Sequence, residues 1–293
     1  MINKLFPSVC IVLMLIQFSN TCAQSTDLVR VEYLRIPENE SGIQTSRYKF
    51  LLNAPIKVNE ENYLIIGGEY NQFDVDFSQQ LPFDKSELQK LHIIDLNLGY
   101  ITKWNDNWRF IGILTPRLAS NFTEGAMTDD FFFNATATLW KEKKDVEKPF
   151  RIVLGLTYNS TTGLPIPLPL ISYYKRFHPK WSYTLGIPKM NFKYHPSSNH
   201  TLQLALLLDG YFINIQDDIL LPDNTLGSRI SLSALIGVIG YQYNITKMMS
   251  LYVLGGRSLI QEGILRNDRR DRTLLLNDEA NFYLRTGFKI SIF

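Results

Sequence analysis

HIIDLNLGYITKW, residues 92–104, alternates apolar and polar side chains along its length. Ile94, Leu96 and Leu98 share one parity, whereas Asp95 takes the other. Successive side chains of a β-strand point to opposite faces, so this stretch predicts a strand with one apolar and one polar face. It is longer than the globular norm of about five or six residues, and a strand that crosses a bilayer needs roughly 9–11.

The same alternation recurs on both sides of that stretch. It is clear at 48–52, 131–139 and 150–159, where the polar positions hold Gly, Asn, Thr and single charges. Pro188 interrupts a pair of short segments, so the expected number of strands is 14, or 12 if that pair is merged or dropped. The expected strands lie near 28–36, 45–53, 62–74, 90–104, 108–118, 131–140, 150–159, 169–177, 181–187, 190–195, 200–215, 229–243, 249–257 and 280–292.

The connections between these segments alternate in length. Short turns are expected at 105–107, 178–180, 196–199 and 244–247, with a longer, highly charged one at 141–149. Longer polar connections are expected between them, near 37–45, 75–89, 120–130, 160–168, 216–228 and 259–278. Short turns at one end and long loops at the other are typical of transmembrane barrels. The sequence therefore predicts an all-β, antiparallel, up-and-down transmembrane barrel of about 12–14 strands.

All four tryptophans fall beside the short turns, at Trp104, Trp108, Trp140 and Trp181. A soluble protein is expected to scatter Trp through its core, whereas a membrane barrel gathers aromatic rings at the lipid–water interface. We therefore expect these four side chains to form an aromatic girdle at the short-turn end.

Residues 1–23 have the layout of a secretory signal peptide. Lys4 is followed by an apolar run at 9–16 and by small residues before a cleavage point after Ala23. Cleavage there would remove both cysteines, Cys10 and Cys22, and leave 24–293 as a single barrel domain. The apolar run is too short for a membrane helix, which takes about 20 residues.

The chain ends in an alternating stretch that closes on an aromatic residue. It resembles the C-terminal recognition strand of bacterial outer-membrane barrels, and the matching residues are Arg285, Gly287, Ile290, Ile292 and Phe293. Phe293 departs from that pattern because its parity is that of the polar face. The resemblance implies insertion by the outer-membrane barrel assembly machinery, contact with outer-membrane lipids, and location in the outer membrane of a Gram-negative bacterium.

The chain as a whole also resembles uncharacterised outer-membrane barrel families that are grouped as domains of unknown function. That resemblance transfers no catalytic residue. From the residues themselves, the polar parity of the strands predicts which charged side chains line the lumen, either as a charged pore or as a filled interior of paired charges. The candidates are Arg47, Lys49, Glu69, Asp95, Lys103, Arg109, Arg151, Arg285 and Lys289, together with Arg30 and Glu32.

Several kinds of chemistry lack support in the sequence. A formal net charge of +2 is too small to indicate a nucleic-acid-binding surface. The sequence also contains no Gly-rich phosphate-binding loop that would indicate a nucleotide site. The spacing of the four histidines suggests no metal site, and no cofactor is expected. A basic run at 266–272 could hold lipid phosphates, but its interleaved Asp268 and Asp271 favour a solvated loop.

We therefore expect a non-enzymatic outer-membrane barrel that acts as a passive pore or as a structural component of the envelope, with no ligand that the sequence identifies. Two alternatives remain. The first is an outer-membrane lipid-modifying enzyme that uses His92 with Asp95 nearby in sequence. The second is an exported soluble β-barrel that binds a ligand.

Overall fold

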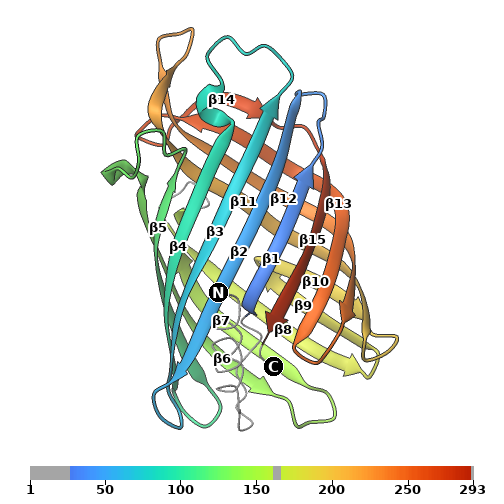
Figure 1. The fold of residues 1–293 in the computed structure, drawn as a ribbon. Helices are drawn as coiled ribbons and strands as arrows, with labels where there is room; N and C mark the ends of the chain where they lie inside the picture. Colours follow the sequence, from blue (N-terminus) through green and yellow to red (C-terminus); the bar gives the residue numbers. More distant parts are fainter. Residues whose placement is uncertain (1–26, 161–165, 292–293) are drawn as a thin grey trace, which may run out of the picture.

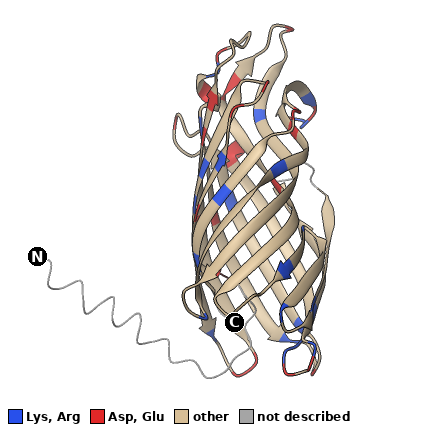
Figure 2. Ribbon diagram, turned by 90° about the vertical axis from the view of Figure 1, so that its right-hand side faces the viewer, with Lys and Arg blue, Asp and Glu red and all other residues tan. Residues whose placement is uncertain are grey.

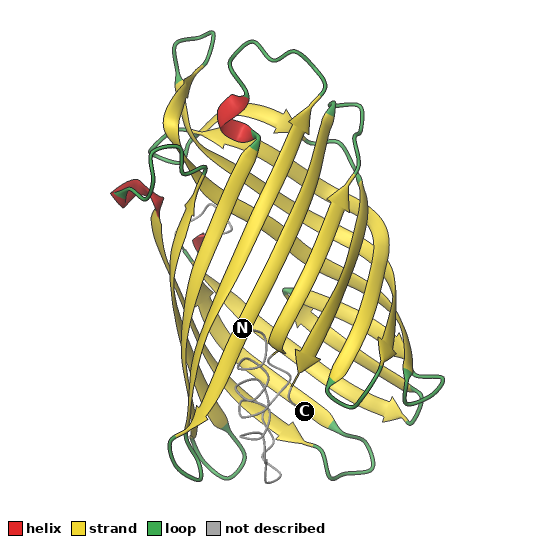
Figure 3. Cartoon of the chain, viewed as in Figure 1, coloured by secondary structure: helices red, strands yellow, loops and turns green. Residues whose placement is uncertain are grey.

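The computed structural model describes residues 27–160 and 166–291, most of them in long strands (Figures 1 and 3). The predicted signal peptide, Ile292 and Phe293 lie outside the described residues. The strands are β1 Asp27–Ile36, β2 Ile43–Lys57, β3 Tyr63–Phe77, β4 Lys90–Lys103, β5 Arg109–Ser120, β6 Phe131–Lys143, β7 Phe150–Tyr158, β8 Pro167–His178, β9 Trp181–Ile187, β10 Lys189–Tyr194, β11 His200–Leu220, β12 Leu226–Asn244, β13 Met249–Arg266, β14 Arg272–Asn277 and β15 Phe282–Ser291. Two short 3-10 helices, η1 Ser86–Leu88 and η2 Thr128–Asp130, precede β4 and β6.

The strands form one closed antiparallel barrel. Neighbours in sequence pair with each other from β1 to β13, and β15 closes the ring between β13 and β1. The short β14 pairs only with β13, so the ring has 14 strands. The predicted fold and the larger of the two predicted strand counts are therefore confirmed. The doubtful pair around Pro188 is real, and it forms the short hairpin β9–β10.

The two ends of the barrel differ as the loop lengths predicted. One end, the short-turn rim, carries the turns 58–62, 104–108, 144–149, 179–180, 195–199 and 245–248. The other end, the long-loop rim, carries the connections that hold η1, η2 and β14. Asp27 pairs with Ser291, so both ends of the described chain lie at the short-turn rim.

The outer surface of the barrel is apolar all the way round. Each of the ring strands exposes at least one large apolar side chain, in order Val31, Leu52, Ile66, Leu98, Leu114, Phe133, Leu156, Ile171, Leu185, Phe192, Leu204, Ile239, Leu251 and Leu284. Figure 2 shows charged residues at scattered positions along the wall and in the loops. A continuous belt of exposed apolar side chains suits contact with lipid and not with water. Among the described residues no helix is long and apolar enough to span a membrane.

The upper part of β11 departs from regular barrel geometry. β10 pairs with β11 only as far as Leu207, and beyond it Asn214 bridges to Ser120 of β5, although β6–β10 separate those strands in the ring. The five residues 211–215 are all buried, so the alternation of exposed and buried side chains stops there. This part of β11 therefore leans inward and meets the opposite wall.

Candidate functional site

The lumen is the candidate site, and its long-loop half is filled by apolar side chains. The inward lean of β11 brings them together with side chains from the opposite wall in one cluster, which we call the apolar seal. Its members are Phe73, Val75, Phe77, Leu88, Leu91, Ile93, Ala119, Phe132, Tyr211, Phe212, Ile213, Ile215, Ile219, Leu221, Ile230 and Leu265. Phe132 of β6 meets Phe212 of β11 edge to face, with ring centroids 5.6 Å apart.

Water does not reach the centre of this seal. Leu88, Leu91, Phe212, Ile213 and Leu265 are all fully buried, although they come from both sides of the barrel. A water-filled channel at this level would leave side chains that face it accessible. A cavity at the edge of the seal, lined by Val75, Phe77, Tyr211 and Ile230 among others, has a volume of about 30 Å³. A packed apolar cluster therefore occupies the lumen toward the long-loop rim.

Below the seal lies a network of paired charges, which we call the lumen brace: Glu32, Arg47, Asp209 and Arg285. The guanidinium of Arg47 (β2) lies 3.1 Å from the carboxylate of Glu32 (β1) and 3.2 Å from that of Asp209 (β11). Arg285 (β15) pairs with the same two carboxylates. Because β11 is not a neighbour of β2 or β15, these pairs tie opposite walls together across the lumen.

Two tyrosines complete the lumen brace. The hydroxyl of Tyr252 donates to Glu32 at 2.5 Å, and that of Tyr283 donates to Asp209 at 2.7 Å. Two further ion pairs lie on the wall nearby, each between adjacent strands. Lys49 of β2 contacts Glu69 of β3 at 2.6 Å, and Arg117 of β5 contacts Asp95 of β4 at 2.7 Å. The middle of the lumen is therefore held by charges that satisfy one another.

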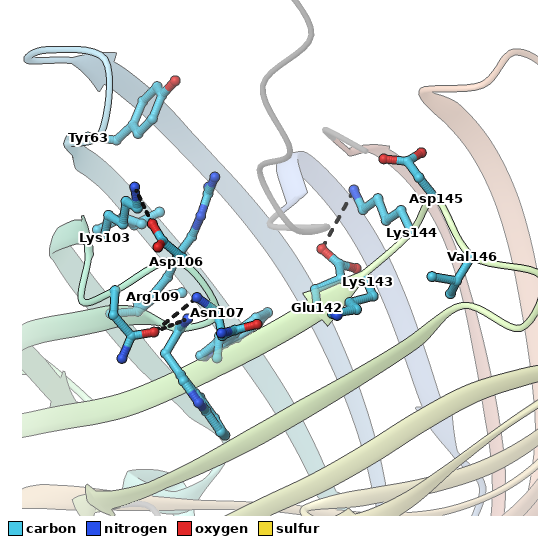
Figure 4. Close-up of a pocket in the computed structure, with 15 residues that line it drawn as sticks. Tyr63, Lys103, Asp106, Asn107, Arg109, Glu142, Lys143, Lys144, Asp145 and Val146 are labelled. Atoms are coloured by element: carbon cyan, nitrogen blue, oxygen red, sulfur yellow. Dashed lines mark hydrogen bonds and ion pairs between the residues drawn. The ribbon is translucent and has the colours of Figure 1, made fainter.

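Two cavities open inside the short-turn rim. The first, of about 420 Å³, lies among β3–β6 and their turns (Figure 4). Acidic and basic side chains are mixed in its lining, and several are paired: Lys103 contacts Glu61 and Asp106, and Glu142 contacts Arg151 and Lys144.

The second cavity, of about 600 Å³, lies between β8–β13 and β15, and we call it the vestibule. Its lining residues are Arg176, Lys193, His195, Ser197, Ser198, Asn199, Thr201, Gln242, Asn244, Thr246, Lys247, Met248, Met249, Ser250, Lys289 and Ser291. None of these described lining residues is acidic, so the charged side chains that line the vestibule are all basic.

A hydrogen-bonded chain crosses the edge of the vestibule. His195, in the β10–β11 turn, has its Nε2 2.9 Å from the hydroxyl of Ser182 and its Nδ1 3.1 Å from that of Thr201. Partial burial and the charges of Arg176 and Lys193 lower the pKa of His195 to about 4, so the ring is neutral at pH 7. Ser182 is buried, which suits a role in holding the turn and not attack on a substrate.

The predicted lumen residues all lie on the inward parity of their strands, opposite the exposed apolar side chains, but they do not form one site. Arg47 and Arg285 join the lumen brace, and Lys49, Glu69 and Asp95 belong to the wall pairs beside it. Four others lie near the short-turn rim: Lys103, Arg109 and Arg151 around the first cavity, and Lys289 in the vestibule.

Tryptophan placement corrects part of the predicted girdle. Trp104 is 65% exposed, Trp181 packs on Tyr194 with ring centroids 4.4 Å apart, and Trp108 lies at the rim beside Lys141. Trp108 and Trp140 both line the first cavity, and Trp140 donates its indole N–H to the hydroxyl of Thr138 at 2.7 Å. The prediction of an outer position is wrong for Trp140 because it shares the inward parity of Thr138 and not that of the apolar residues of β6.

The described part of the C-terminal pattern has a packing role. Gly287 faces the lumen, and a Cβ there would lie 2.6 Å from the Tyr252 hydroxyl and 2.8 Å from the Val31 carbonyl oxygen. A side chain at this position would displace the tyrosine that binds Glu32. Ile290 takes the outward parity of β15, between β1 and β13.

His92 lies on the outer parity of β4, toward the long-loop rim. Its Nδ1 is 2.8 Å from the Tyr70 hydroxyl, and Ser120 is its cross-strand partner on β5. Ser120 is fully buried and donates its hydroxyl to Asn121, while Asp95 faces the lumen and pairs with Arg117. The described contacts therefore bring His92 neither a free serine nor Asp95.

Sequence reasoning missed Asp209, Lys193 and the inward lean of β11. Asp209 lies on the same parity as the apolar Leu207, so alternation alone did not mark it as part of a polar face. The lean has a signal in the uninterrupted apolar run Tyr211-Phe212-Ile213, because a strand with one wet face should alternate there. Among the described residues no group of His, Cys, Asp or Glu is placed to hold a metal ion.

Comparison with solved structures finds loose similarity to outer-membrane proteins. An outer-membrane channel (COG4313) from Pseudomonas putida F1 is 13% identical, with a TM-score of 0.45 over 94% of this chain and 98% of the other. The KdgM porin in complex with disordered oligogalacturonate is 10% identical (TM-score 0.36; 90% and 100% covered). Outer membrane phospholipase A from Escherichia coli is also 10% identical (TM-score 0.37; 92% and 98% covered).

These structural similarities are too loose to transfer a ligand or a reaction. No curated protein matches the sequence. Residues 38–291 match a family profile described as a domain of unknown function, and the chain therefore belongs to that family, DUF6268.

Proposed function

We propose that the protein is an outer-membrane β-barrel of a Gram-negative bacterium that keeps its lumen sealed and serves as a structural or binding component of the envelope. The observation that carries this proposal is the apolar seal, whose central side chains come from opposite walls and are fully buried. The sequence leaves open a passive pore and a structural role. A permanently open pore would require water at the level of the seal, so the seal favours the structural role.

The location rests on the outer surface. Its apolar belt fits lipid and disfavours the alternative of an exported soluble barrel. An even number of strands puts both described ends at one rim, which in bacterial outer-membrane barrels faces the periplasm. Export with a cleaved signal peptide and insertion by the barrel assembly machinery complete the proposal.

Conductance in planar bilayers tests the seal. We expect the refolded protein to insert and remain electrically silent, with an established porin in the same bilayer as positive control. A double variant, Leu91→Ser with Phe212→Ser, hydrates the seal from both walls and should raise conductance. Heat-dependent gel migration verifies that each variant is folded. A steady channel current from the unmodified protein would contradict the proposal.

We further propose that the barrel does not hydrolyse lipids. His92 is bound to Tyr70, its cross-strand serine is buried, and Asp95 is held by Arg117 on the other face. Incubation of the folded barrel with phospholipid and with lipopolysaccharide should release no fatty acid. Fatty-acid release that is abolished by His92→Ala would instead support the enzymatic alternative.

A further inference from the structure

We propose that the vestibule binds a small multivalent anion that carries phosphate or carboxylate groups and enters from the periplasmic side. The vestibule opens at the short-turn rim, and its volume of about 600 Å³ suits a small molecule. The proposal does not depend on the seal, because a conducting barrel would contain the same cavity. The bilayer experiment and the binding experiment can therefore fail separately.

The first support is convergence of positive charge from separate elements. Arg176 comes from β8, Lys193 from β10, Lys289 from β15 and Lys247 from the β12–β13 turn, and all four line one cavity. No acidic side chain accompanies them among the described lining residues. Like charges held together in a partly enclosed space repel one another and focus a field that attracts anions.

The second support is that the two inward lysines lack ionic partners. Within the described part of the chain, neither Lys193 nor Lys289 forms an ion pair. The carboxylate of Asp27 lies next to this region, but it is occupied by Arg30 and by the hydroxyl of Ser291. Two ammonium groups are therefore left to face the cavity, where phosphate or carboxylate oxygens would pair with them.

The first cavity provides an internal contrast at the same rim. There Lys103 is already paired with Glu61 and Asp106, and Glu142 serves both Arg151 and Lys144. Its lining also includes the acidic side chains of Asp106, Glu142 and Asp145, which offset the basic ones. The same fold thus neutralises one side of its mouth and leaves the other side basic, which is the arrangement expected if only the vestibule receives an anion.

Polar donors around the cations would let the site fix more than one anionic group. The hydroxyl of Ser197 accepts from the backbone amide of Asn199 and keeps its own proton to donate, and Lys247 lies in the neighbouring exposed turn. A ligand with two or more charged groups would span Lys193 and Lys289 together. A monovalent anion would engage them one at a time and bind less tightly.

Isothermal titration of the folded full-length barrel in neutral detergent tests the proposal, with pyrophosphate and citrate as probes. We expect saturable binding of at least one probe, weakened by added salt. Lys193→Gln and Lys289→Gln should each weaken it by about tenfold or more, the loss expected for one charge-assisted contact. Lys103→Gln removes a paired lysine from the same rim and should leave binding unchanged.

The outcomes separate cleanly. Binding of pyrophosphate alone identifies a phosphate ligand, and binding of citrate alone identifies a carboxylate ligand; either supports the site. No saturable binding of either probe at low salt overturns it. Binding that Lys103→Gln weakens as much as Lys193→Gln also overturns it, because the anion would then be responding only to overall charge.

Discussion

Asp209→Asn should destabilise the barrel more than any surface carboxylate substitution. The Asp209 side chain is 18% exposed and accepts from Arg47 and Arg285, whose side chains are 8% and 14% exposed. In the native lumen brace, two arginines face two carboxylates and the charges cancel; the substitution leaves a net charge of +1. Asparagine has nearly the same size, so the change removes charge without opening a cavity.

The expected loss in the free energy of unfolding depends on the burial of Asp209 and on the ion pairs that Arg47 and Arg285 keep. Removing one partner of a buried ion pair costs roughly 3–5 kcal/mol, because the other charge stays buried without compensation. Here both arginines keep Glu32, at 3.1 Å and 3.4 Å, so the loss should lie near the lower limit, about 3 kcal/mol. Tyr283 retains an acceptor in the amide oxygen and adds little.

The measurement is denaturant unfolding of the barrel in detergent micelles, followed by tryptophan fluorescence. Asp106→Asn is the matched control: its carboxylate lies 3.0 Å from Lys103, but it is 93% exposed. An exposed pair contributes about 0–1 kcal/mol, so this control should unfold almost as the native protein does. Equal losses for the two variants, both below about 1 kcal/mol, would refute the claim that the lumen brace ties the walls together.

Three further predictions concern the seal, the turn and the girdle. Leu88→Ala should cost about 2–5 kcal/mol in the same unfolding experiment, because it opens a cavity in the seal, whereas the lipid-facing Leu98→Ala should cost far less. The pKa of His195, about 4 in the folded protein against an ordinary 6.5, means that the unfolded chain takes up its proton first as pH falls. Stability should therefore be highest above pH 6.5 and decline between 6.5 and 4, and His195→Gln should remove that part of the decline. Brominated lipids should quench Trp104 fluorescence but not that of Trp140; equal quenching would contradict the inward placement of Trp140.

The alternation of apolar and polar residues predicts most of the fold, because the strands of a membrane barrel face lipid on one side and the lumen on the other. The lipid side demands an apolar residue at every second position, so strands such as 92–104 and the positions of the short turns could be predicted. The short hairpin β9–β10 was harder, since Pro188 and brief strands weaken the pattern, yet both segments lie where alternation placed them. Lumen-facing residues could be named by parity.

The parts that could not be predicted depend on which lumen residues meet. Parity places Arg47 and Arg285 inside but does not say that Asp209 of β11 approaches them across the barrel. The same limit applies to the vestibule, because lysines as far apart in sequence as Lys193 and Lys289 come to line one cavity only when the wall from β10 to β13 and β15 curves around the lumen. The prediction for Trp140 was wrong because it relied on the residue type and not on the parity of Trp140 within β6.

The run Tyr211-Phe212-Ile213 explains why the two halves of the lumen differ. In a regular wall, one side of this run would face lumen water and expose large apolar side chains there. By leaning inward to Ser120, β11 buries both of its faces against β3–β6, and each fully buried large apolar side chain contributes about 1.5–3 kcal/mol. Below Leu207, where β10 pairs with β11, the regular wall resumes. A second buried apolar cluster, which includes Ala205, Leu207 and Val238, lies at this level, and the polar and basic side chains of the vestibule line the mouth. The end of β10 therefore marks the level beyond which β11 is free to lean into the lumen.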